Sequence, residues 1–280
     1  MCNSYAYCVA YCVVYCVVCF VMRFVVCFVV YCVVCIFLMH IFSERLEDGD
    51  FMEKMIKTIT TSKIKDPGSA ITHFIGMLMA IFAGMPLIIK ALRAPDLIHV
   101  ASLSIFIVSM VMLYGASTTY HTFDISPRIN KMLKKLDHCM ISVMIAGSYT
   151  PVCLIVLHGP VGYGLLALVW GIAIIGIIFK LCWVTCPRWV SSALYIIMGW
   201  ACVLSFTQLI NALPAGAFAW LLAGGIIYTV GGVIYALKLP IFNARHRNFG
   251  SHEIFHLFVM AGSVCHFIMM FKYVALFPIG

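Results

Sequence analysis

The chain has 280 residues, of which 64% are apolar and 10% are charged, and its mean hydropathy is +1.08. This composition excludes a soluble globular domain, which is about half apolar, and an intrinsically disordered chain. The formal net charge of +8 does not indicate nucleic-acid binding, because the 18 Lys and Arg residues are spread along the chain without an aromatic and basic module. We therefore expect an integral membrane protein in contact with membrane lipids, and the low charge favours helices over a β-barrel.

Residues 1–51 are a low-complexity hydrophobic extension that is rich in Cys, Val and Tyr. Eight of the 14 cysteines lie in the first 35 residues, within a unit close to Tyr-Cys-Val-Val that recurs every four residues. Such a repeat gives a helix no constant apolar stripe. The extension is either translated repetitive upstream DNA, with the natural start at Met52 or Met55, or a genuine additional membrane anchor. Both alternatives leave one membrane domain over residues 52–280.

Seven apolar runs of roughly 20 residues follow the extension, and each is long enough to cross about 30 Å of hydrocarbon as a helix. Turn residues such as Ser126-Pro127 separate the runs. Because the connections are short, the sequence predicts an all-α fold, a polytopic membrane protein with one seven-transmembrane helix bundle. The predicted spans cover residues 70–92, 98–121, 138–157, 161–181, 190–210, 217–237 and 252–273.

Basic residues gather on one side of the predicted bundle. Arg23 lies in the extension, and 14 of the other 17 Lys and Arg residues lie between the extension's apolar part and the first span or in or beside the loops after the second, fourth and sixth spans. Lys90, Arg93 and Lys272 lie on the opposite side. Because cytoplasmic loops carry an excess of positive charge, we expect the N-terminal side of the seven-helix core to be cytoplasmic.

Polar side chains converge at the cytoplasmic ends of four predicted spans. Ionisable residues inside spans are costly and indicate a functional site. We interpret His99, His158 and His246, by contrast, as interfacial residues. The converging residues are His73, Ser117, His121, Asp137, His138, His252, Glu253 and His256.

A metal site is the first interpretation of these residues. His252 and His256 are four residues apart, so both imidazoles lie on one helix face. With Glu253 they match the H-E-x-x-H pattern, in which the Glu is a general base. His121 is the candidate third ligand. Three His ligands leave Zn²⁺ one open position for water, as in catalytic sites.

Two further residues could assist a metal-bound water. Ser117 lies on the same helix face as His121 and could donate a hydrogen bond, and Asp137 could accept a proton. Alternatively, Asp137 opens its helix and complements the helix dipole. We expect His138 to face elsewhere, because adjacent residues do not share a helix face. His73 is either a polar contact of the site or a packing residue.

Three strings in this chain resemble the hemolysin III family, the bacterial branch of the progestin and adipoQ receptor superfamily that includes the adiponectin receptors. The strings are YGASTTYH (114–121), LDHCMISVMIAGSYTP (136–151) and HEIFHLFV (252–259). DPGSAITHFIG (66–76) resembles the opening motif of the family, but that motif usually carries further acidic residues and an Asn, so no role is assigned to Asp66. The resemblance covers about residue 60 to the C-terminus, and the first 50 residues have no counterpart in it.

The resemblance implies seven helices in the bacterial plasma (inner) membrane, with Zn²⁺ near the cytoplasmic face. The implied ligands are His121, His252 and His256, and the residues that support the water are Ser117 and Asp137. The receptors can have Gln at the position of Glu253, which argues against an obligatory base there.

Two functions from different classes follow. The first is a metal-dependent hydrolase of a lipid amide or ester, similar to what is proposed for the wider superfamily that includes alkaline ceramidases. The second is a non-enzymatic membrane protein in which structural zinc affects membrane homeostasis or signalling. The family name also implies cytolysis, but nothing in the chain resembles a secreted pore-former. The sequence leaves the substrate and the oligomeric state open.

Overall fold

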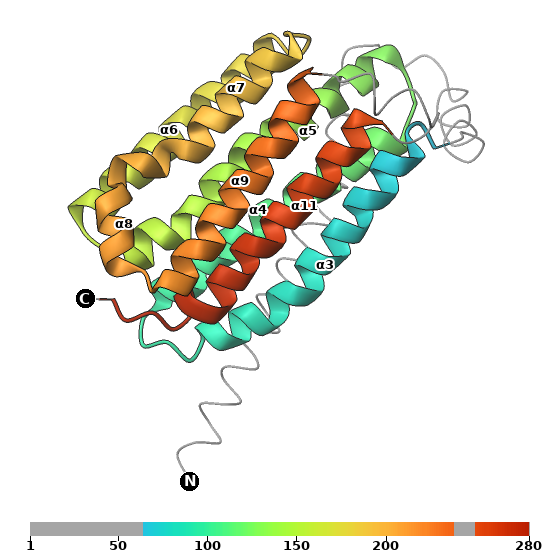
Figure 1. Cartoon of the computed structure of the whole chain (residues 1–280). Helices are drawn as coiled ribbons and strands as arrows, with labels where there is room; N and C mark the ends of the chain where they lie inside the picture. The colour runs from blue at the N-terminus through green and yellow to red at the C-terminus, as the bar shows by residue number, and fades with distance from the viewer. Residues whose placement is uncertain (1–63, 238–249, 280) are drawn as a thin grey trace, which may run out of the picture.

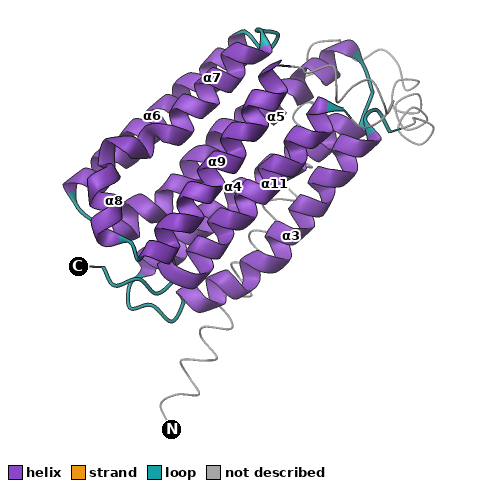
Figure 2. Cartoon of the chain, viewed as in Figure 1, coloured by secondary structure: helices purple, strands orange, loops and turns teal. Residues whose placement is uncertain are grey.

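The structure, a computed structural model, describes residues 64–237 and 250–279, which form helices and connecting turns without a strand (Figure 2). Among these residues, seven helices are long and apolar enough to cross a membrane. They lie side by side as one bundle (Figure 1). The predicted seven-span, all-α fold is therefore confirmed. The hydrophobic extension of residues 1–51 lies outside the described residues.

Three of the spans combine an α-helix with a tighter or wider turn. A π-helical turn continues α5 to Val156 and another continues α11 to Val274, whereas a 3₁₀ turn joins α7 to α8 within the fifth span. The helices are α3 (Pro67–Ala91), α4 (Leu97–Thr122), α5 (Pro127–Pro151), α6 (Pro160–Cys182), α7 (Arg188–Gly199), α8 (Phe206–Ala212), α9 (Ala215–Leu237) and α11 (Ser251–Met269).

The outer surface of the bundle is apolar and its interior contains small polar side chains. Phe82 on α3, Ile175 on α6 and Ile197 on α7 are each more than half exposed, whereas Ser102 and Ser142 are fully buried. Such exposure of large apolar groups would be unfavourable in water and is what lipid-facing helices require. The arrangement fits an integral membrane protein.

Close helix contacts fix the position of α11, which carries two of the candidate ligands. A Cβ atom added at Gly262 of α11 would lie 2.7 Å from the ring of Tyr228 on α9. One added at Gly231 of α9 would lie 2.6 Å from Cβ of Phe258 on α11. Small residues therefore let these two helices approach closely, as is common between membrane helices.

The third span begins earlier than the sequence analysis expected. Helix α5 starts at Pro127, and the Oγ of Ser126 accepts a hydrogen bond from the backbone N–H of Ile129 as the N-terminal cap. The basic segment that was predicted to be a loop therefore forms the first turns of α5. Asp137 lies in the third turn rather than at the helix start, so its interpretation as a helix-dipole charge was wrong, because that effect fades beyond the first turn.

Candidate metal centre

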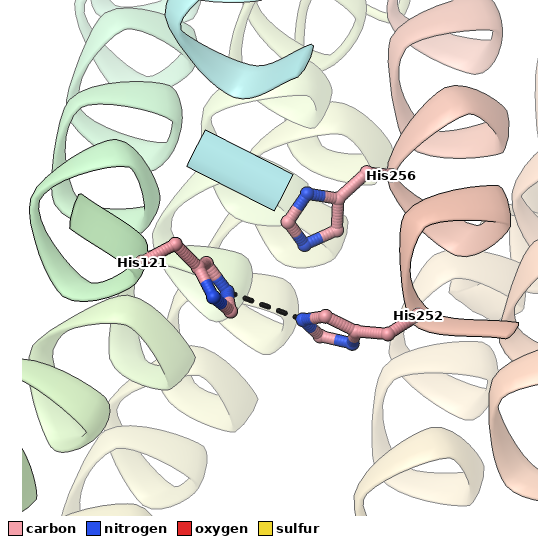
Figure 3. A group of neighbouring side chains, drawn as sticks. All are labelled: His121, His252 and His256. Atoms are coloured by element: carbon pink, nitrogen blue, oxygen red, sulfur yellow. Dashed lines mark hydrogen bonds between the residues drawn. The ribbon is translucent and has the colours of Figure 1, made fainter. Parts of the chain in front are cut away.

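Three imidazoles meet near the end of the bundle where α3 and α11 begin (Figure 3). His121 lies in the last turn of α4, and His252 and His256 lie in the first two turns of α11. One potential ligand atom from each lies within 4.8 Å of the others, and the two Nε2 atoms of His121 and His252 are 3.1 Å apart. Two nitrogens on one tetrahedral zinc ion would be about 3.3 Å apart. This histidine cluster (His121, His252 and His256) could hold a metal ion.

Asp66 orients the ring of His121. Its Oδ2 lies 3.0 Å from Nδ1 of His121, and the backbone N–H of Asp66 donates to the His121 carbonyl at 2.9 Å. With Nδ1–H donated to the carboxylate, the Nε2 lone pair of His121 faces the other two imidazoles. No role for Asp66 was predicted from the sequence. The sequence feature that could have drawn attention to it is its position directly before Pro67, the first residue of α3.

Thr72 has the same relation to His256. Its hydroxyl lies 2.9 Å from the carbonyl of Gly68 and 3.0 Å from that of Ser69, so its hydrogen is directed to the backbone of α3. The Thr72 Oγ1 can then accept from Nδ1–H of His256, at 3.4 Å, which assigns the free lone pair of that imidazole to Nε2. Helix α3 and the residue before it therefore supply a supporting contact to one histidine on each of α4 and α11.

His73 packs against the cluster. Its ring is stacked on that of His256, with centroids 3.6 Å apart and an interplanar angle of 7°. His73 is buried, and neither of its ring nitrogens has a hydrogen-bond partner among the described residues. The ring also meets that of Tyr114 edge-on, with centroids 5.1 Å apart, and His73 lines the cavity beside the cluster.

Ser117 and Asp137 lie on the wall of the same cavity as His252 and His256. Both side chains are buried, and Ser117 Oγ has no hydrogen-bond partner within the part of the chain that the structure describes. An Oδ2 of Asp137 lies 3.5 Å from Nδ1 of His138, which also lines the cavity. The expectation that His138 faces elsewhere was therefore wrong, because its Nδ1, 2.9 Å from the carbonyl of Lys134 one turn earlier, holds the ring on the cavity wall beside Asp137.

Glu253 is occupied by contacts that begin its own helix. Its Oε2 accepts from the backbone N–H of Gly250 at 2.7 Å, which caps α11, and its Oε1 accepts from the hydroxyl of Ser69 at 2.8 Å. These contacts join the starts of α11 and α3. They assign Glu253 a positioning task within the H-E-x-x-H string.

The cavity beside the cluster has a volume of about 140 Å³ and extends into the bundle between α5, α7, α9 and α11. Along α11 it is lined from His252 to His266, a rise of about 21 Å. Most of its wall is apolar, with side chains such as Met144, Ile196 and Val259. This length exceeds one leaflet of a hydrocarbon core that is about 30 Å thick.

Comparison with known proteins places the chain in a family. The sequence pattern described as Haemolysin-III related matches residues 61–267, which include the whole histidine cluster. The chain belongs to this family. It is 40% identical over 223 residues to Hemolysin-3 of Bacillus cereus, with 79% of this chain and 97% of that protein covered.

Two other relatives extend the comparison. The chain is 37% identical over 210 residues to the Hemolysin-3 homolog of Bacillus subtilis (strain 168), which covers 75% of this chain and 94% of that protein. It is 26% identical over 186 residues to the adiponectin receptor protein of Drosophila melanogaster, which covers 58% of this chain and 40% of the receptor. The haemolysin-III related protein therefore resembles its bacterial relatives over nearly their full length.

Proposed function

We propose that this haemolysin-III related protein is a zinc-dependent hydrolase of a lipid amide or ester. The observation that carries the proposal is the histidine cluster at one end of a long apolar cavity, with a carboxylate and a hydroxyl on the same wall. Three imidazoles with supporting Asp and Thr contacts are a donor set suited to zinc. The apolar cavity suits an acyl chain, whose polar linkage would then lie beside the cluster.

The proposed roles follow from the atoms that remain available. His121, His252 and His256 would hold the zinc. Bound zinc supplies a Lewis acid and lowers the pKa of a coordinated water to about 7. Asp137 would accept a proton at its carboxylate, and Ser117 would donate a hydrogen bond from Oγ into the cavity.

We also propose a location in the bacterial plasma membrane, with the cluster near the cytoplasmic face. The support is the excess of Lys and Arg beside the helix ends at which the cluster lies, together with the two bacterial relatives. Membrane lipids would reach the cavity from this leaflet.

A structural zinc is the competing proposal, and one observation favours it. The three imidazoles come from α4 and α11, and the residues that support them come from α3 and the position directly before it. A metal ion there would tie together helices that are distant in the sequence. The protein would then be a non-enzymatic membrane protein that affects membrane homeostasis or signalling.

The first experiment is elemental analysis of the detergent-purified protein beside the His252→Ala/His256→Ala double variant. We expect about one zinc per chain in the wild type and near none in the variant. Hydrolysis of lipid amides and esters would then be assayed on the wild type. Zinc absent from both proteins after purification without chelators would contradict the proposal.

The variant Asp137→Ala separates the enzyme from the structural zinc. If the site is catalytic, turnover falls by about 10² to 10⁴-fold and the zinc content stays unchanged. If zinc is structural, the variant changes thermal stability and no hydrolysis is seen in either protein. Zinc content, turnover and the unfolding temperature are measured on the same preparations.

A further inference from the structure

A second cavity opens on the outer side of the histidine cluster. Its volume is about 520 Å³, and His121 and His252 are part of its wall. One side of it is formed by α4 and α11 together with Asp66. The other side is formed by α5, the turn between α6 and α7, and the start of α7, from which Lys134 and Arg188 line the space. The cavity therefore has an acidic side and a basic side.

The carboxylates of the acidic side have partners. Asp66 accepts from His121, and both carboxylate oxygens of Glu253 accept hydrogen bonds, from Ser69 and from the backbone N–H of Gly250. These contacts hold both carboxylates in place, and neither forms an ion pair with Lys134 or Arg188 among the described residues.

The cations of the basic side have no such partner within residues 64–237 and 250–279. Neither Lys134 nor Arg188 forms an ion pair there, and the Arg188 guanidinium lies 5.1 Å from the centroid of the Tyr235 ring. A cation stacked on an aromatic ring keeps its hydrogen-bond donors for another group.

A third cation supports this side from behind. Lys180 lies in the last turn of α6, beside the loop as predicted, and it is fully buried. Its Nζ donates to the Sγ of Cys186 and to the hydroxyl of Ser191, and it forms no ion pair with a carboxylate of the described residues. Cys186 and Ser191 line the cavity, so the Lys180 charge lies directly behind this side of it. We call Lys134, Lys180 and Arg188 the basic wall.

Lys134 and Arg188 give this side of the cavity a positive charge that favours an anionic ligand. Basic pockets between transmembrane helices on the cytoplasmic side bind anionic lipid headgroups. Arg binds phosphate through two parallel hydrogen bonds, and Lys binds it as a point charge. The cavity lies at the helix ends, which is the depth of the headgroups, and it adjoins the cluster whose other side faces the apolar cavity.

We infer that the basic wall binds the phosphate group of an anionic lipid through Lys134 and Arg188, and so selects phosphate-bearing lipids for this site. The part of the inference that concerns substrate selection rests on the proposed hydrolase. The binding itself does not. The lipid's acyl linkage would lie between the phosphate at the basic wall and the chain in the apolar cavity, next to the histidine cluster.

The experiment measures lipid binding without catalysis, because every protein in it, the wild-type reference included, also carries Asp137→Ala, which should retain zinc and lose turnover. Dihexanoyl phosphatidate, and dihexanoylglycerol as its phosphate-free counterpart, are titrated into detergent-solubilised full-length protein by isothermal titration calorimetry. We expect the Lys134→Gln/Arg188→Gln variant to bind phosphatidate at least about tenfold more weakly than the wild type. Dihexanoylglycerol should bind equally to both. Rising NaCl concentration should weaken only the phosphatidate binding.

The matched control is Lys131→Gln/Arg93→Gln, which removes the same charge from two exposed positions outside the cavity. It should bind phosphatidate like the wild type. Equal weakening in the control, or equal binding by the wild type and the basic-wall variant, would overturn the inference. If inorganic phosphate competes for the site with the same affinity as phosphatidate, the assignment to a lipid headgroup is overturned.

Single variants and a hydrolysis assay separate a folding defect from lost binding, and the basic-wall site from the proposed hydrolase. If the double variant does not fold, the single variants Lys134→Gln and Arg188→Gln and the salt dependence of the wild type test the same claim. Selective binding of phosphatidate, with no hydrolysis by the protein that retains Asp137, would contradict the proposed hydrolase and leave the basic-wall site standing. Hydrolysis of lipids without selective binding would contradict the basic-wall site alone.

Discussion

Helix α4 has a buried histidine at each end, and the two differ in where their ring nitrogens point. His99 is 1% exposed and His121 is 3% exposed, so burial does not distinguish them. Nε2 of His99 lies 2.9 Å from the carbonyl of Phe277, and its Nδ1 lies 3.3 Å from that of Asp96. Both nitrogens of His99 therefore face backbone carbonyls. His121 uses Nδ1 for Asp66 and directs Nε2 at another imidazole.

The hydrogen-bond partners of a buried histidine, rather than its burial, therefore distinguish a structural residue from a candidate metal ligand. His99 joins the start of α4 to the segment after α11, which is a structural task. His121 has one nitrogen held and one nitrogen available, which is the arrangement of a metal ligand. The interpretation of His99 as an interfacial residue was wrong, whereas His158 is exposed as expected and His246 lies outside the described residues.

Substituting the two histidines of α4 should give the largest difference, which is in zinc content. His121→Ala should reduce bound zinc from about one per chain to near none, because the ligand that bridges from α4 is lost. His99→Ala should retain the zinc and lower the free energy of unfolding by about 1–3 kcal/mol, because the backbone carbonyls lose their partner. Zinc content by elemental analysis and unfolding in detergent measure the two effects. Equal zinc loss in both variants would contradict the comparison.

Asp66→Ala tests whether the contact between the Asp66 carboxylate and Nδ1 of His121 contributes to zinc binding. Removing the carboxylate that orients His121 should weaken zinc binding by about 10 to 100-fold, since such supporting contacts fix the ligand's tautomer and direction. Competition with a chelator of known affinity measures the change. The control is Asp96→Ala, whose side chain does not contact the cluster, and it should leave zinc affinity unchanged.

Ser117→Ala tests whether a buried hydroxyl without a hydrogen-bond partner among the described residues contributes to the reaction. Its hydroxyl is buried without a partner in the described part of the chain and lies on the cavity wall, so we expect turnover to fall by about tenfold with zinc retained. Ser109→Ala provides the control, because the Ser109 hydroxyl donates to the Phe106 carbonyl within α4. Comparable loss of turnover in the control would argue against a role for Ser117 in the reaction.

The smallest effect is expected at Glu253. Both of its carboxylate oxygens are engaged, so Glu253→Gln should change turnover by less than about threefold, because an amide oxygen can still cap α11. A loss of 10² to 10⁴-fold, the usual size of a general-base effect, would restore the H-E-x-x-H base interpretation. Steady-state hydrolysis rates at matched zinc content distinguish the two results.

Sequence reasoning found the spans and the cluster because both depend on short-range patterns. The apolar runs have the length of a membrane helix, and the spacing of His252 and His256 places them on one face. The start of α5 was missed because hydropathy follows the apolar residues, whereas Ser126 and Pro127 begin the helix in a basic segment.

The supporting contacts could not be predicted in the same way. Asp66 contacts a residue 55 positions away, and Thr72 contacts one 184 positions away, so both depend on how α3, α4 and α11 pack. The burial of Lys180 likewise depends on α7 covering the end of α6, where its partners Cys186 and Ser191 lie. No periodicity in the sequence carries this information.

The separation of the facing imidazoles along the chain has a consequence for biogenesis. His121 and His252 are 131 residues apart. The third to sixth membrane spans lie entirely between them, and the seventh begins just before His252. At about 5–20 residues per second, the ribosome needs roughly 7–26 s between the two. A metal site that uses both histidines therefore cannot assemble until the last span has been inserted, and metal loading would follow insertion of the whole bundle.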